Sequence, residues 1–194
     1  MKLFALIIGL FFLTNSLVIA SEKDAVDEFL SLWNNCDNDK KNNIPRFNAL
    51  LMLGEEENKD NISLKKTLGN VMVMDLKKTR DEENYRDKEM FFYFLDAGGV
   101  YGIEDPFECF TKDALIAMSM VVLSMKDETI LYFAKDSRHY GNLVRLLTFS
   151  EKKDLKRLEE VYKKLMGVSK NSFYRDRLKP LKDTSESFKL SDAF

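Results

Sequence analysis

Few side chains in this sequence could do chemistry, and imidazole is the scarcest of them. The chain has one histidine, His139, and its neighbours Asp136, Ser137 and Arg138 indicate a polar helix end, where a cation is favoured. A Ser-His-Asp triad would have to be assembled from residues far apart in the sequence, and no serine lies in the pattern of a nucleophile elbow. The sequence therefore gives no specific prediction of nucleophilic catalysis.

A loop from Gly98 to Pro106 is rich in glycine, and Glu89 precedes it by about ten residues. Glycoside hydrolysis needs an acid with a raised pKa and usually a second carboxylate, which Asp96, Glu104 or Asp105 could supply. The arrangement resembles that of helical muramidases, which place a glutamate at a helix end before such a loop. The resemblance implies an envelope glycan hydrolase of lysozyme-like type with Glu89 as general acid. The serine after the glutamate and the Met-Gln after the loop are absent, and a plain interhelical turn is the competing interpretation.

The sequence predicts no metal site and no cofactor. Asp37-Asn38-Asp39 begins like a calcium loop, but the turn glycine is missing and Asn48 stands where the closing glutamate belongs. Two Met-x-Met pairs, at Met72 and at Met118, offer soft ligands for Cu(I). Residues two apart on a helix diverge by about 200°, so neither pair can hold one ion. Met72, Met118 and Met125 fall on apolar stripes, so we expect these three methionines in the core.

The N-terminus, residues 1–20, has the pattern of a cleaved secretory signal peptide. Lys2 precedes an apolar run from Leu3 to Leu13, and Val18 and Ala20 suit the two positions before a cleavage at Ser21. The run makes about 16 Å of helix, whereas a membrane span needs about 30 Å. We therefore expect a secreted or periplasmic protein.

Export makes the two cysteines informative. Cys36 and Cys109 are the only pair that the chain offers, and an oxidising compartment favours a disulfide between them. Such a bridge would contribute about 4 kcal/mol in the chain-entropy model. Two buried thiols that never meet are the alternative, because the sequence does not give their separation. The sequon at Asn61 has meaning only in a eukaryote.

With 194 residues, 45% of them hydrophobic and 32% charged, the chain can form one compact domain. Apolar residues recur at three- and four-residue steps, which predicts an all-α fold, a bundle or short helical array. Met90–Leu95 and Thr129–Phe133 could be strands instead. We expect about seven to eight helices over residues 21–167, then a polar, flexible C-terminal tail over 168–194. The expected helices cover about 21–36, 45–54, 63–79, 81–97, 111–125, 127–141, 143–149 and 150–167. Thr111 and Ser150 are the predicted N-caps of the helices that they begin. The apolar stripe of 63–79 consists of Leu64, Leu68, Val71, Met72 and Leu76.

Charge is unevenly distributed along the sequence. Residues 22–60 contain ten acids and five bases, whereas residues 151–182 contain eleven bases and five acids. The basic segment 152–182 could attach to an anionic surface, although a solvated helix face is the plainer interpretation. Aromatic residues do not interleave with these bases, so nucleic-acid binding is not predicted.

These patterns together favour an exported helical binding module over an enzyme. Its partner would be another protein outside the cytoplasm, and an inhibitor or immunity-type protein is the corresponding class. The acidic N-terminal part could mimic an anionic substrate of that partner, and exposed aromatic residues could anchor it. The candidates for these anchors are Tyr101, Phe107 and Phe110.

Overall fold

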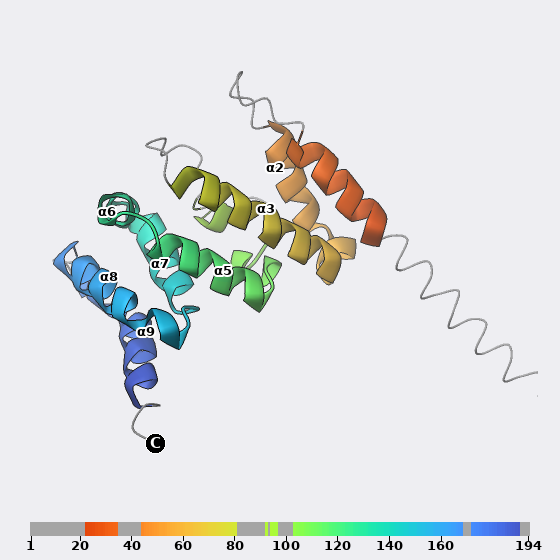
Figure 1. Ribbon diagram of the computed structural model, residues 1–194. Coiled ribbons are helices and arrows are strands. Elements are labelled where there is room, and N and C mark those ends of the chain that lie inside the picture. Colours follow the sequence, from red (N-terminus) through yellow and green to blue (C-terminus); the bar gives the residue numbers. More distant parts are fainter. Residues whose placement is uncertain are drawn as a thin grey trace, which may run out of the picture. The chain divides into compact units, whose positions relative to one another are not determined.

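The computed structural model describes residues 22–34, 44–80, 92, 94–96, 103–168 and 172–190. Throughout these ranges the chain forms helices and turns and no strand, which confirms the predicted all-α class (Figure 1). Thr129–Phe133, the segment that could have been a strand, lies within helix α6 (Asp127–Lys135). None of the described helices is both long enough and apolar enough to cross a membrane.

Contacts group the chain into two compact units, where the sequence predicted one domain. The first unit contains the described residues up to Thr67 together with 103–104, and the second contains the other described residues. Helix α3 (Ile62–Arg80) contributes its first residues to the first unit and, from Leu68 onward, the remainder to the second.

The core of the first unit forms around one aromatic pair. Helix 22–34 buries Phe29 and Trp33, whose stacked rings lie 5.4 Å apart between centroids. The guanidinium of Arg46, on α2 (Ile44–Leu51), lies over the Trp33 ring at 5.0 Å. A cation over an indole face is attracted by the ring quadrupole, so this contact helps to hold the two helices together.

Two buried asparagines direct the chain from α2 into α3. Between these helices lie the short 3₁₀ turns η1 (Met52–Gly54) and η2 (Glu56–Asn58), and the Asn58 amide donates to the Met52 carbonyl at 3.0 Å. The side-chain oxygen of Asn61 accepts from the backbone N–H of Leu64 at 2.8 Å. Asn61 therefore caps α3, because a side-chain acceptor at this position satisfies a free N–H of the first turn.

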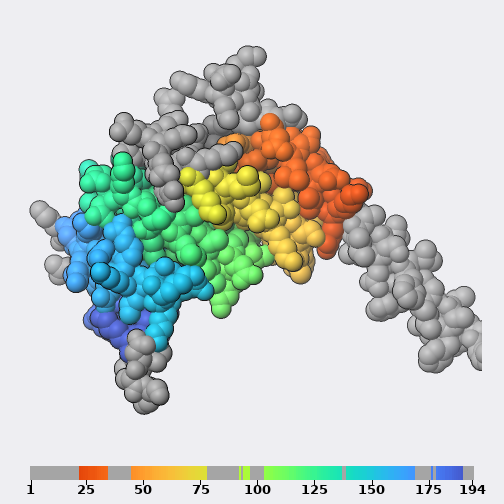
Figure 2. Space-filling model, in the orientation of Figure 1, coloured from red at the N-terminus to blue at the C-terminus, as the bar shows by residue number. Residues whose placement is uncertain are grey.

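The second unit contains α5 (Lys112–Leu123), α6, α7 (Ser137–Leu147), α8 (Leu155–Val168) and α9 (Ser172–Leu190), with the short turns η4 (Pro106–Cys109) and η5 (Lys152–Asp154). Helices α7 and α8 each contact α5, α6 and α9. The residues of α6 and α8 lie side by side on the face shown in Figure 2. The most apolar helix, α5, is thus covered by α7 and α8, and its Met118 and Val122 are buried.

Helices α3 and α5 approach each other closely at Gly69. A Cβ atom added there would lie 2.5 Å from the Cβ of Ala114, far closer than two carbon atoms can approach. Because Ala114 Cβ is fixed to the α5 backbone, a side chain at position 69 would push the two helices apart. Glycine is therefore required at this crossing for steric reasons.

The predicted N-caps have different outcomes. Thr111 caps α5 as expected, since its hydroxyl accepts from the backbone N–H of Ala114 at 3.3 Å. The prediction that Ser150 caps the next helix is wrong. Its hydroxyl instead donates to the Leu147 carbonyl and accepts from Ser119, both at 2.7 Å, and this buried bond links the end of α7 to α5.

The predicted helix 127–141 is divided at Asp136. Asp136 has an extended backbone, with φ −82° and ψ 122°, and its carbonyl accepts from the N–H of Tyr140. Helix α6 therefore ends at Lys135, and α7 begins at Ser137. Asp and Ser compete with the helical backbone for hydrogen bonds and favour such boundaries.

Helix α9 (Ser172–Leu190) occupies the described part of the segment 168–194 beyond α8, for which the sequence predicted a flexible tail. It contacts α7 and α8, and its Leu178, Leu181 and Ser185 are buried. These three residues form one stripe at steps of three and four in a segment that is otherwise polar. Pro180 lies inside the helix, where it removes one backbone donor. The low hydrophobicity of the segment hid a helix that needs only a narrow apolar stripe.

Candidate functional site

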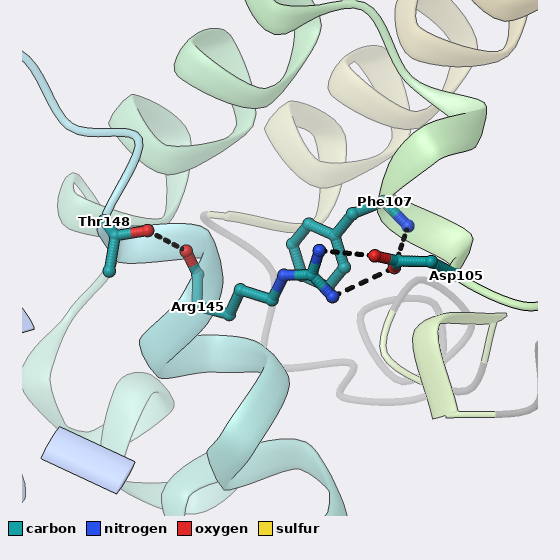
Figure 3. Close-up of polar contacts among 4 residues, drawn as sticks. All are labelled: Asp105, Phe107, Arg145 and Thr148. Atoms are coloured by element: carbon teal, nitrogen blue, oxygen red, sulfur yellow. Dashed lines mark hydrogen bonds and ion pairs between the residues drawn. The ribbon is translucent and has the colours of Figure 1, made fainter. Parts of the chain in front are cut away.

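An exposed ion pair joins η4 to α7 (Figure 3). The two guanidinium nitrogens of Arg145 donate to the two carboxylate oxygens of Asp105, at 2.9 and 2.5 Å. Asp105 also caps η4 by accepting from the N–H of Phe107 at 3.0 Å. The hydrogen bond from Arg145 holds the pKa of the Asp105 carboxyl below its usual value. Both carboxylate oxygens of Asp105 thus help to hold η4 against α7.

Phe107 and Phe110 are not exposed anchors, which corrects the prediction made for them. The Phe107 ring is buried against Phe149, with centroids 6.2 Å apart, and the Arg145 guanidinium lies 4.1 Å from its centroid. Phe110 is buried edge-on against Phe94 at 5.8 Å. Turn η4 points both rings inward, which a mixed aromatic and polar loop sequence does not reveal.

His139 lies in the first turn of α7, within a buried polar cluster. The predicted polar helix end is thus an N-terminal end, where the helix dipole does not favour a cation. The Nδ1 of His139 lies 2.5 Å from a carboxylate oxygen of Asp96, and the Asn142 amide donates to the other oxygen. The rings of Phe92 and Phe133 cover the imidazole at 5.6 and 6.2 Å. A His–Asp pair can act as a general base where a substrate reaches the imidazole. Because His139 is only 5% exposed, this arrangement offers little of the ring to a substrate.

Arg157 connects α8 to the turn between α5 and α6. It donates to the carbonyls of Leu123 and Met125 at 2.9 and 3.0 Å, and it pairs with Asp127 at 2.9 Å. Lys164 contacts the second carboxylate oxygen of Asp127 at 2.7 Å. The hydrogen bonds from Lys164 and then from Arg157 lower the pKa of Asp127. This cluster satisfies carbonyls at the end of α5 and places an acid at the start of α6, where the helix dipole favours it.

Three of the predicted site residues, Glu89, Tyr101 and Cys36, lie outside the described residues. Cys109, the expected partner of Cys36, is buried in η4, and no cysteine pair lies at disulfide distance within the described ranges. The disulfide therefore stays a prediction, which the mass of the intact protein before and after reduction would check. Residues 1–20, with the expected signal peptide, also lie outside the description.

The described residues of the basic segment 152–182 lie in η5, in α8 and in the first part of α9, and acids are interspersed among its bases. Several of its lysines make ion pairs, so much of its charge is balanced locally. Attachment to an anionic surface through residues 152–182 stays a prediction. The lysine pairs on these two helices and the turn before them are Lys153–Glu151, Lys164–Asp127, Lys179–Asp183, Lys182–Glu186 and Lys189–Glu159.

The sequence did not reveal the exposed apolar surface of α2. Phe47 and Leu51, one helical turn apart, are 41% and 47% exposed, whereas Ala49 and Leu50 are buried. Ile62, at the start of α3, is 60% exposed in the same unit. One sequence feature could have indicated this surface. α2 has apolar residues on more than one side, and such a helix is normally covered by neighbours on more than one side.

The comparisons with known proteins give no family. No family model, curated protein or solved structure matches the chain. Among the residues that the structure describes, no three His, Cys, Asp or Glu side chains are placed to share a metal ion.

Proposed function

We propose that this protein is a helical binding module that captures another protein through α2. The exposed pair Phe47 and Leu51 supports this proposal most directly, since large apolar side chains on one helix turn can enter a partner's pocket. Ala49 and Leu50 fix the opposite side of the helix in the core. The surface is therefore presented on a rigid element, which lowers the entropic cost of association.

The use of the polar groups also supports a binding role. Asp105 and Arg145 hold η4 to α7, and Asp127 and Arg157 join three helices. His139 is covered by aromatic rings. These charged and titratable side chains thus make contacts within the fold, while α2 offers apolar area to a partner.

We place this binding outside the cytoplasm, as the sequence of residues 1–20 predicts. Small exported helical proteins that sequester a partner act as inhibitors or immunity-type proteins, and we propose that class by analogy. The described acids Asp24, Asp27 and Glu28 on helix 22–34 are exposed. They favour a partner whose contact surface is basic, because complementary charge accelerates association and excludes wrong partners.

The test is a capture experiment with protein beginning at Ser21, immobilised and exposed to envelope and culture-medium extracts. We expect one stoichiometric partner on the native protein and a loss of at least about tenfold in its affinity with Phe47→Ser/Leu51→Ser. Met74→Ser/Met120→Ser is the matched control, because both methionines are exposed on other helices. Circular dichroism confirms that both double variants remain helical.

Equal capture by the native protein and the α2 variant would contradict the proposed surface. An empty capture together with glycan hydrolysis that disappears in Glu89→Gln would contradict the binding role and support the lysozyme-like alternative.

A further inference from the structure

The helices α8 and α9 enclose a groove of about 250 Å³ on the surface of the second unit. Tyr162 and Met166 of α8 supply its large apolar side chains, and the buried Ser185 of α9 also lines it. Lysines come from both helices, Lys163 from α8 and Lys182 from α9. The groove therefore combines apolar area with ammonium groups on two separate elements.

The charges that line the groove do not cancel. Three lysines and two glutamates line it, which leaves one positive charge. Lys189 pairs with Glu159, and this contact holds the pKa of the Glu159 carboxyl below its usual value. These two residues thus neutralise each other. The remaining lining charges are Lys163, Lys182 and Glu186, which together carry the one excess positive charge.

Lys163 and Lys182 keep donors for a ligand. Lys182 Nζ lies 3.5 Å from the nearest oxygen of Glu186, which is longer than a hydrogen bond. Lys163 makes no ion pair with any described carboxylate, although its charge contributes to the lowered pKa of Glu159. An ammonium group has three donors, so these two lysines can bind an anion without breaking a hydrogen bond of the fold.

We propose that this groove binds a small amphiphilic anion, in which one carboxylate or phosphate monoester is attached to an aliphatic or aromatic body. Its volume corresponds to about eight water molecules, which suits a body of about eight to ten non-hydrogen atoms. The head group would contact Lys163 and Lys182, and the body would lie against Tyr162 and Met166. Lysine stems add apolar contact while their charges stay in water. This inference goes beyond the capture of a protein through α2 and is independent of it.

The test is isothermal titration calorimetry of the protein with octyl phosphate and with octanoate, both below their micelle concentrations. We expect one site for each, with inorganic phosphate and octanol both at least about tenfold weaker. Shortening the chain from eight to six carbons should weaken binding about fourfold per methylene that the groove buries. These arms separate the contributions of the head group and the body.

Two double variants assign the site. Lys163→Gln/Lys182→Gln should reduce the affinity for octyl phosphate at least about tenfold, because both positive charges at the head group are lost and with them the charge-assisted hydrogen bonds. Lys156→Gln/Lys179→Gln is the matched control, since these exposed lysines lie on the same helices but do not line the groove. The control should change the affinity less than about twofold. Circular dichroism checks that both variants fold.

Three results would overturn the proposal. The first is no heat from either octyl compound at millimolar concentration. The second is an equal loss in the two double variants, which would indicate a diffuse charge effect. The third is binding to vesicles of anionic phospholipid without binding to octyl phosphate or octanoate, which would indicate attachment to a surface and not a ligand in the groove.

Discussion

Two helix pairs in the second unit are held together in different ways. Where α3 crosses α5, Gly69 lets the backbones approach so closely that no side chain fits between them. Where α8 lies against α9, a narrow leucine stripe and ion pairs such as Lys189–Glu159 make the contact, and a groove remains between the helices. We therefore expect the first pair to tolerate few substitutions at its crossing, and the second to tolerate substitutions outside Leu178 and Leu181. A site for a ligand is more easily accommodated in the second.

The largest effect should come from the leucine stripe of α9. Leu181→Ala removes a fully buried side chain and should lower the free energy of unfolding by about 3 kcal/mol, because it leaves a cavity. Urea denaturation followed by circular dichroism measures this change. Lys179→Ala, an exposed position on the same helix, should change it by less than about 0.5 kcal/mol. Similar small effects for both variants would mean that α9 is not part of the core.

The next effect should come from the crossing of α3 and α5. Gly69→Ala should destabilise the protein by about 2 kcal/mol, because the helices must separate to admit a methyl group. Gly167→Ala is the matched control, since nothing lies within 4 Å of the added Cβ on α8. It should stabilise the protein by up to about 1 kcal/mol through helix propensity. A lower midpoint of thermal unfolding for Gly69→Ala and a higher one for Gly167→Ala would support the contrast between the two pairs. Adding Ala114→Gly to Gly69→Ala should recover much of the lost stability, because it removes the clashing methyl group.

A smaller effect is expected at Arg157 of α8, which contacts the end of α5 and so connects the two helix pairs compared above. Arg157→Leu keeps the apolar stem but removes the donors to the carbonyls of Leu123 and Met125, which should cost about 1.5 kcal/mol. Lys164→Met removes only one partly exposed ion pair and should cost less than about 1 kcal/mol. Chemical denaturation in parallel compares the two. Because Arg157→Leu also removes the ion pair to Asp127, equal losses would show that the carbonyl contacts add nothing to the stability beyond such an ion pair.

The smallest expected effect is the loss, at low pH, of the stability that Asp105 contributes. The pKa of Asp105 is lower in the folded protein than its ordinary value near 3.8, so its stabilising contribution is present above that pH and is lost as the pH falls through the folded pKa. Asp105→Asn should therefore be less stable than the native protein at pH 6, by under about 1 kcal/mol. The difference should shrink below pH ~4. A difference that stays constant between pH 6 and pH 3 in urea titrations would contradict the assigned role of the Arg145 pair.

What the sequence predicted correctly was local. The cap at Thr111 and the apolar stripe of α3 depend on residues three or four apart, so a pattern can show them. The missed features depend on distant residues. The Asp105–Arg145 and Asp96–His139 contacts join residues more than 35 positions apart, and nothing in their local sequence marks them as partners.

Burial was harder to predict than helix formation. Phe47 and Phe107 are both aromatic residues in segments that mix apolar and polar side chains, yet one is exposed and the other is buried. Their difference arises from the turn that carries Phe107 and from the guanidinium that covers it. Helix α9 was missed for the converse reason, because Leu178 and Leu181 suffice to dock a segment that is otherwise charged.

The position of Trp33 determines which part of the protein its fluorescence reports on. Trp33 is the only tryptophan in the chain and lies in the first unit, beneath the guanidinium of Arg46. Its fluorescence therefore reports on the first unit alone, whereas far-ultraviolet circular dichroism averages over every helix. Coincident melting curves from the two signals would indicate one cooperative transition, and separated curves would indicate that the two units unfold independently.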